Sequence, residues 1–171
     1  MSEDARIVLF DFTLPVAATE WLTVNDGVMG GVTDGQFGIT DLKTLAFFGT
    51  LSLENNGGFA SVRTRPKNLG LRPGDALRVR VRGDRRQYSL NLYVPRPQIA
   101  FSHRATVTTT NEEWVEVTLP LDTFDATSFG RPVRDAGPVD PKEVNALGFM
   151  VSDKIAGPFK LEVEWIMVAR T

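Results

Sequence analysis

Apolar and polar residues alternate along much of this chain. In residues 76–82, leucine and valine alternate with three arginines, and this period of two is typical of a strand with one buried face. The alternation resumes in residues 88–93 after the turn-forming pair Gly83-Asp84. The pattern therefore predicts a hairpin between the two runs.

A second hairpin is predicted around the tetrapeptide from Asn55 to Gly58, because asparagine and glycine tolerate the positive φ angles of tight turns. Its strands would run over residues 44–54 and 59–65. Further strands are predicted at residues 7–12, 21–24, 99–107, 114–119, 146–151 and 159–168. The chain therefore has about ten predicted strands.

Helical signal is confined to residues 121–127 and 141–144, each of which is expected to form about one turn. No segment has a sustained helical period. Residues 128–139 are rich in proline and glycine and are predicted to form a long surface loop. Many short antiparallel strands with so little helix predict a β-sandwich or barrel, in a single domain over residues 1–171.

The composition excludes several classes of function. The sequence has no cysteine and one histidine, which leaves no thiolate nucleophile, no cysteine-based zinc or iron–sulfur site and no multi-histidine metal centre. The net charge of −2 creates no global field for nucleic acid, and the glycines are not spaced as in a phosphate-binding loop. We therefore expect no cofactor, although a structural calcium ion bound by Asp11, Asp26 or Asp34 stays open.

The first residues are acidic and lead directly into the apolar run 7–10, without the basic start and long apolar segment of a secretory signal. No run approaches the roughly 18 apolar residues of a membrane-spanning helix. The sequence thus predicts a cytoplasmic protein that does not insert directly into a membrane.

Three blocks of the sequence carry a family resemblance. They are WLTVNDGVMGGV from Trp21, FGTLSLENNGGFASVR from Phe48 and DKIAGPFKLEVEWI from Asp153. Together they resemble the complex I intermediate-associated protein 30 family. The resemblance implies an antiparallel jelly-roll β-sandwich of the galactose-binding-domain-like type, with at most one or two short helical turns.

Members of this family act as assembly factors for respiratory complex I, and relatives in photosynthetic organisms help to build photosynthetic machinery. The resemblance therefore implies a non-catalytic binding or assembly role, with subunits or assembly factors of a membrane complex as protein partners. The alternative is a carbohydrate-binding module, which the type of fold and the polar neighbours of Tyr93 suggest. The client, any bound glycan and the oligomeric state stay open.

Two glycine-rich loops supply the first candidate binding residues. If the loops lie together they form one polar patch, whose members are Asn25, Asp26, Met29, Asn55, Asn56 and Arg63. Loops at the end of a sandwich often carry function. The alternative is that these residues only build tight corners between strands.

A second candidate site is a sheet face. Arg80, the middle of three alternating arginines, would bind a carbohydrate, an anionic group or a polypeptide together with Asn91 and Tyr93 if their strands adjoin. The alternative is a solvated ladder, in which the arginines pair with the outward glutamates of residues 160–164.

Nothing in the sequence assembles a catalytic centre. His103 is expected to be structural, and a Ser-His-Asp triad with Ser89 or Ser102 lacks the supporting Gly-x-Ser-x-Gly elbow. The tryptophans and phenylalanines are expected in the core. We therefore expect no enzymatic activity.

Overall fold

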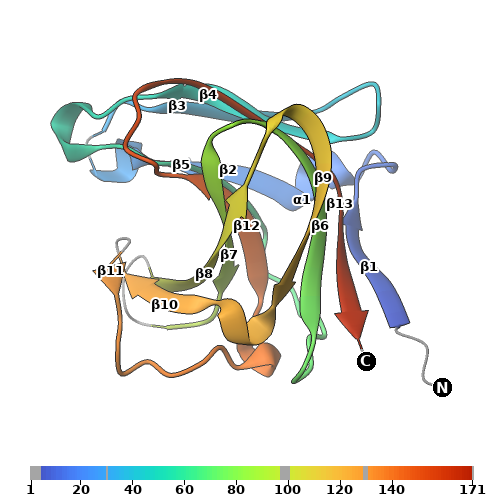
Figure 1. Ribbon diagram of the computed structural model, residues 1–171. Coiled ribbons are helices and arrows are strands. Elements are labelled where there is room, and N and C mark those ends of the chain that lie inside the picture. The colour runs from blue at the N-terminus through green and yellow to red at the C-terminus, as the bar shows by residue number, and fades with distance from the viewer. Residues whose placement is uncertain (1–4, 30, 97–100, 129–130, 171) are drawn as a thin grey trace.

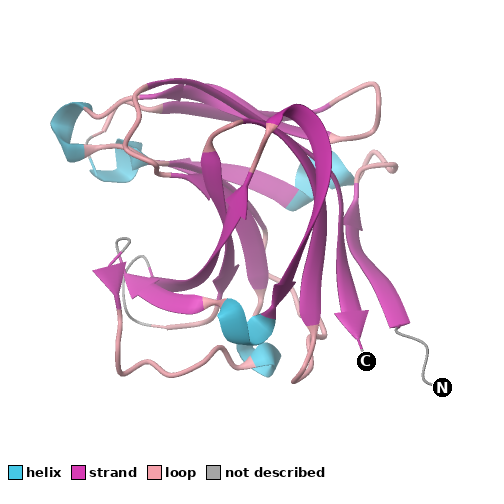
Figure 2. Ribbon diagram, viewed as in Figure 1, coloured by secondary structure: helices cyan, strands magenta, loops and turns pink. Residues whose placement is uncertain are grey.

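Two antiparallel β-sheets pack against each other in the computed structural model (Figure 1, Figure 2), which describes residues 5–29, 31–96, 101–128 and 131–170. The six-stranded sheet contains, in order, β3 (Asp34–Ile39), β4 (Leu45–Leu51), β13 (Gly157–Arg170), β6 (Ala76–Asp84) and β9 (Asn111–Pro120), with β1 (Ala5–Asp11) also beside β13. The seven-stranded sheet contains β11 (Arg131–Pro132), β10 (Asp125–Ser128), β8 (Phe101–Thr108), β7 (Gln87–Tyr93), β12 (Ala146–Val151), β5 (Ala60–Thr64) and β2 (Trp21–Asn25). The predicted all-β sandwich is confirmed.

Helices are limited to short turns. They are α1 (Ala17–Glu20) and the 3-10 turns η1 (Asp26–Met29), η2 (Glu54–Asn56), η3 (Leu121–Thr123) and η4 (Pro141–Glu143). The last two lie where the sequence predicted helical turns, but the first of those segments ends early because its final residues pair with β8 as strand β10. Strand β11 also interrupts the predicted loop over 128–139. Within the described ranges, no helix has the length and apolar character needed to cross a membrane.

Neither predicted hairpin forms, because in each case the two strands belong to different sheets. Strand β6 pairs with β13 and β9, whereas β7 pairs with β12 and β8; strands β4 and β5 are separated in the same way. Alternation of apolar and polar residues shows that one face of a strand is buried. Strands of both sheets have one buried face, so alternation does not specify which strand lies beside which. Asn55 and Gly58 do have positive φ angles of 56° and 129°, but they build a corner between the sheets.

Strand β3 gives a weak sequence signal because glycines occupy two of its six positions. One of them, Gly35, is required by close packing, since a Cβ atom there would lie 2.8 Å from the Cβ atom of Ala60 in the other sheet. The glycine that weakens the strand pattern therefore lets the two sheets approach each other.

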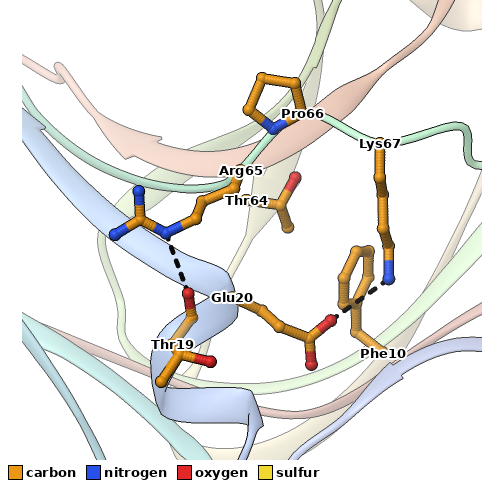
Figure 3. A pocket seen from close by; sticks show the side chains of 7 residues that line it. All are labelled: Phe10, Thr19, Glu20, Thr64, Arg65, Pro66 and Lys67. Carbon is orange, nitrogen blue, oxygen red and sulfur yellow. Dashed lines mark hydrogen bonds and ion pairs between the residues drawn. The ribbon is translucent and has the colours of Figure 1, made fainter.

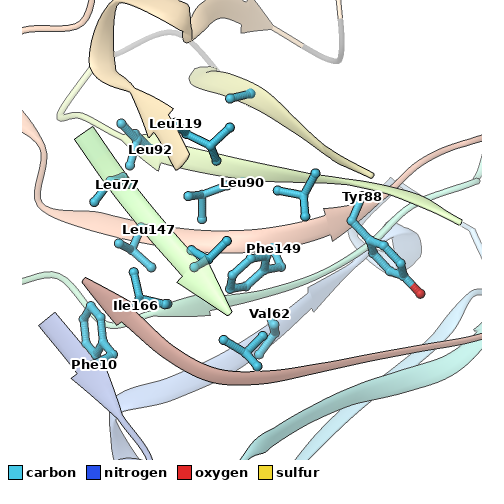
Figure 4. Packing of buried hydrophobic residues seen from close by; sticks show 14 of the residues in the cluster. Phe10, Val62, Leu77, Tyr88, Leu90, Leu92, Leu119, Leu147, Phe149 and Ile166 are labelled. Atoms are coloured by element: carbon cyan, nitrogen blue, oxygen red, sulfur yellow. The ribbon is translucent and has the colours of Figure 1, made fainter. Parts of the chain in front are cut away.

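The core lies between the sheets and contains the inward side chains of both (Figure 4). Leu77 of β6 and Leu90 of β7 are completely buried, as their alternation predicted. Phe10 and Trp21 pack edge to face with ring centroids 5.3 Å apart. Since burial of one large apolar side chain contributes about 1.5–3 kcal/mol, the core holds the sheets together and leaves their outer faces for other contacts.

Candidate functional site

One row of residues crosses the outer face of the seven-stranded sheet. Arg63 of β5, Gly148 of β12, Asn91 of β7 and Arg104 of β8 are neighbours in the cross-strand register, and we call these four residues the arginine row. The Cα atoms of the two arginines are three strand spacings apart, or about 14 Å. This sheet is strongly curved, and its outer face lies on the inside of the curve, toward the left of Figure 1.

Polar side chains on this face are unusually buried. Asn91 and Ser61 are 0% exposed although both point away from the core, and Met150 of β12 is only 7% exposed. Because a curved sheet brings side chains on its inner side together, neighbours cover these residues. The face is therefore a concave and partly dehydrated surface.

Tyr93 is the aromatic residue of this face and is held on two sides. The guanidinium carbon of Arg63 lies 4.3 Å from the centroid of its ring, a cation–π contact. Asn91 donates a hydrogen bond to the Tyr93 hydroxyl at 3.4 Å and accepts one from the Ser89 hydroxyl at 2.8 Å. The ring and the guanidinium are thus positioned by contacts within the sheet.

Gly148 makes the contact between Arg63 and Tyr93 feasible. A Cβ atom at Gly148 would collide with the backbone carbonyl oxygen of Val62 and would lie 2.7 Å from the Cβ atom of Arg63, closer than real side chains approach. Without that atom, the Arg63 side chain crosses β12 and reaches Tyr93 on β7. A single glycine therefore shapes the floor of the site.

The two arginines of the row lack counter-charges. Within the described part of the chain, neither Arg63 nor Arg104 has a carboxylate within ion-pair distance, and the buried Nε atom of each has no hydrogen-bond acceptor. Burial lowers the pKa of Arg104, and nearby Tyr93 acts in the opposite direction. Asp125 follows Arg104 in the register but is exposed and forms no ion pair with it. The site is therefore cationic and not neutralised.

The first predicted patch is organised around a buried carboxylate. Asp26 is 0% exposed and accepts hydrogen bonds from the backbone N–H groups of Thr33 at 2.9 Å and Gly58 at 2.7 Å. Burial acts to raise the pKa of Asp26, but hydrogen bonds donated by Thr33, Gly58 and Phe59 together hold it below its usual range. The two glycine-rich loops therefore lie together, with Asp26 as the link between them.

The remaining members of that patch occupy different positions. Asn25 donates a hydrogen bond to the carbonyl oxygen of Gly35 at 3.0 Å, and Asn55 is exposed. The side chains of Met29 and Asn56 lie outside the described residues. Because the Asp26 side chain is buried, it does not contact a partner directly and serves to hold the two loops in place. A binding role for this patch stays a prediction.

Arg80 does not join Asn91 and Tyr93, because β6 and β7 belong to different sheets. It forms ion pairs with Glu164 at 2.9 Å and Glu116 at 3.5 Å on the opposite face of the molecule, in the ladder that the alternative interpretation predicted. Trp114 lies there too, partly exposed and under the Arg80 guanidinium at 5.4 Å. The expectation that this tryptophan lies in the core is wrong.

His103 is separated from the candidate serines. Its side chain is 1% exposed and faces the core opposite Leu92, whereas Ser89 and Ser102 lie on the outer face of the same sheet. Burial, with a contribution from the charge of Arg96, lowers the pKa of His103. The described residues also contain no group of three histidine, aspartate or glutamate side chains that could hold a metal ion.

A small pocket lies at the edge of the seven-stranded sheet beside α1 (Figure 3). Its lining includes Lys67, which forms an ion pair with Glu20 at 3.2 Å and lies over the Phe10 ring, and Arg65, whose Nε atom donates to the Thr19 carbonyl at 2.9 Å. The charged groups of this pocket are already paired, in contrast to those of the arginine row.

The sequence pattern indicates Arg63, Asn91 and Tyr93 as binding residues but groups Arg63 with the loops, and it does not single out Arg104 or Gly148. Alternation around residue 104 puts Arg104 on the face opposite His103. Only the strand order, which the sequence does not specify, then brings it beside Asn91.

Residues 10–163 match the family described as complex I intermediate-associated protein 30. The mouse protein named "Complex I intermediate-associated protein 30, mitochondrial" is 28% identical over 97% of this chain and 56% of its own length. The Drosophila melanogaster protein of the same name is 24% identical over 93% of this chain and 61% of its own length. The chain thus spans less than two thirds of either relative.

Solved structures with a similar fold include carbohydrate-binding modules of the jelly-roll type. A family 11 module from Clostridium thermocellum, in complex with a β-1,3-1,4-mixed-linked tetrasaccharide, has a TM-score of 0.64 at 11% identity and covers 99% of this chain and 97% of its own. A family 30 module of a cellulosomal cellulase from the same organism has a TM-score of 0.64 at 12% identity, with 96% of each chain covered. At such identities the similarity shows the fold, and it confirms the predicted galactose-binding-like jelly roll.

Proposed function

Because this chain belongs to the complex I intermediate-associated protein 30 family, we propose that it is a non-catalytic module that assists the assembly of a respiratory membrane complex by binding protein partners. The observation that carries this proposal is the family match over residues 10–163. The proposal takes residues 1–171 as one domain. Cytoplasmic location stays a prediction, since the two relatives are named as mitochondrial proteins.

The proposed contact surface is the concave face around the arginine row. A charged partner is favoured where the fold leaves charges without a counter-charge, and Arg63 and Arg104 are such groups in the described structure. The loop patch linked by Asp26 borders the same sheet through β2 and β5 and is proposed as a second contact region. A non-catalytic role agrees with the position of His103, which faces the core.

The proposed function is tested by deleting the gene in the organism that produces the protein. We expect native gels of the deletion strain to show less of the assembled respiratory complex and more of its subassemblies, and the wild-type gene to restore the normal pattern. Normal assembly in the deletion strain would contradict the proposal. Arg78→Gln removes an arginine that pairs with Glu116 on the six-stranded sheet, away from the arginine row. A gene with this change is the control for variants of the row and is expected to restore assembly fully.

The second candidate function is carbohydrate binding, which Tyr93 beside Asn91 and Ser89 favours. Stacking on a sugar requires a free aromatic face, and the Arg63 guanidinium covers one face of Tyr93 at 4.3 Å. Tyr93 is also the one aromatic side chain that the register places on the outer face of the described strands of this sheet. A glycan array, with and without calcium, tests this candidate, and absence of binding in both conditions would remove it.

A further inference from the structure

The two arginines of the row differ from the other partly buried arginines of the described chain because they have no carboxylate partner. Arg86 pairs with Asp153 at 2.8 Å and Arg170 with Asp75 at 2.9 Å, so partly buried arginines elsewhere in this fold are neutralised. The Arg63 side chain donates one long hydrogen bond, of 3.4 Å, to the Ser61 hydroxyl, and the Arg104 side chain makes no hydrogen bond or ion pair within the described chain. Because a partly dehydrated guanidinium without a counter-charge is unfavourable, a carboxylate from another molecule would neutralise it.

From this difference, and resting on the proposed function, we propose that Arg63 and Arg104 bind the carboxylate groups of an acidic segment of the partner polypeptide. A guanidinium stacked on an aromatic ring keeps its in-plane N–H donors free, and these donors match the two oxygens of a carboxylate. Tyr93 holds Arg63 in that orientation. Arg104 lies beside Asn91 on β8, on the side of β7 opposite Gly148.

The surroundings favour a polypeptide carboxylate over a phosphate group. Phosphate sites commonly use free backbone N–H groups at the start of a helix, whereas the N–H groups beneath the arginine row are engaged in strand pairing. Met150 and Val24 lie on the same face, and methionine adapts to varied apolar side chains. Acidic and apolar side chains of one segment therefore match the charge and the character of this surface.

The test uses two synthetic peptides with blocked ends. One alternates glutamate with valine, and its control alternates glutamine with valine, so that the two differ only in charge. Calorimetry and titration of the isotopically labelled protein measure binding. We expect the glutamate peptide to bind at least ten times more tightly than the glutamine peptide, to shift the Nε–H signals of Arg63 and Arg104, and to weaken as salt is added.

Variants locate the interaction. Arg63→Gln and Arg104→Gln are each expected to weaken glutamate-peptide binding at least tenfold, whereas Arg78→Gln on the opposite sheet leaves it unchanged. The amide spectrum of each variant shows whether it folds. If one of the two row variants does not fold, the other is sufficient to test the proposal. Equal binding of the two peptides, no binding of either, or the same loss in Arg78→Gln would overturn the proposal.

The outcomes separate this inference from the proposed function. If an acidic oligosaccharide binds the row and the glutamate peptide does not, the polypeptide assignment is wrong. If the row variants restore complex assembly in the deletion strain as well as the wild type does, the arginine row has no part in assembly, but the proposed function stands. If the deletion strain assembles the complex normally, the proposed function fails whatever the peptides do.

Discussion

The guanidinium carbon of Arg63 lies 4.3 Å from the ring centroid of Tyr93, although strand β12 separates the strands that carry them. The contact depends on Gly148, which leaves the intervening strand without a side chain at this point. It also depends on Asn91, which contacts the Tyr93 hydroxyl. A cationic group is thereby fixed at the centre of a concave sheet face by residues from three neighbouring strands.

Replacement of Tyr93 tests how Arg63 is positioned. Tyr93→Ala removes the ring, so we expect the Arg63 Nε–H signal to move toward that of a free arginine, with a loss of about 0.5–2 kcal/mol in the free energy of unfolding. Tyr93→Phe keeps the ring and loses only one long hydrogen bond, and should leave the signal in place. Urea unfolding and nitrogen-resolved spectra measure both effects. An unchanged Arg63 signal in Tyr93→Ala would contradict this account.

Replacement of Gly148 tests the floor of the site. Gly148→Ala places a Cβ atom against the Val62 carbonyl oxygen and against Arg63, so we expect a loss of about 2–4 kcal/mol in unfolding free energy, since overpacking and backbone displacement combine. Gly38→Ala is the matched control, because no atom lies within 4 Å of its added Cβ. That variant should be neutral or slightly stabilising. Similar destabilisation of both variants would show that Gly148 has no special role.

The sequence predicts the fold type well and the strand order poorly. Alternation in β6 and β7 correctly identifies Leu77 and Leu90 as core residues, because burial of one face is a local property of a strand. The pairing of β6 with β13 joins residues 76–84 to residues 157–170, and no local pattern records so distant a neighbour. The predicted hairpins fail for this reason.

The candidate site also has one part that local sequence indicates and one part that depends on strand order. The two glycine-rich loops do lie together, since Asp26 accepts hydrogen bonds from Thr33 and Gly58, but turn chemistry predicted only tight turns and left the proximity of the loops as one of two alternatives. The arginine row has no such local signal, because Arg63, Asn91 and Arg104 become neighbours only through the order β5-β12-β7-β8. Residue types thus indicated the chemistry, and the sheet topology decided which residues share it.

Asp26→Asn tests the link between the loops. An amide has one acceptor oxygen and adds N–H donors where the backbone N–H groups of Thr33 and Gly58 already point, so we expect a loss of about 2–4 kcal/mol. Asp34→Asn, at an exposed carboxylate nearby, should change stability by less than about 0.5 kcal/mol. Chemical unfolding at neutral pH measures both. Equal small effects would show that the loops do not depend on Asp26.

The lowered pKa of Asp26 also predicts a dependence on acid. The group binds protons more weakly in the folded state than in the unfolded state, so its stabilising contribution is complete above the unfolded pKa of about 3.9 and is lost as the pH falls through the lower folded value. Asp26→Asn should therefore lose less stability than the wild type below about pH 4. Parallel losses in both proteins would contradict this.

His103 predicts a second pH dependence, in a range where carboxylates titrate little. Burial and the charge of Arg96 lower its pKa, with Glu143 acting in the opposite direction. The contribution of neutral His103 to the free energy of unfolding is therefore complete above the unfolded pKa of about 6.5. It declines as the pH falls, by at most about 1.4 kcal/mol per pH unit. Unfolding between about pH 5 and 7.5 should show this slope in the wild type and a flatter profile in His103→Leu, whatever that variant's overall stability. The sequence contains one histidine, so His103→Leu leaves no imidazole to titrate. Identical slopes in the two proteins would therefore mean that a group of another type causes the decline.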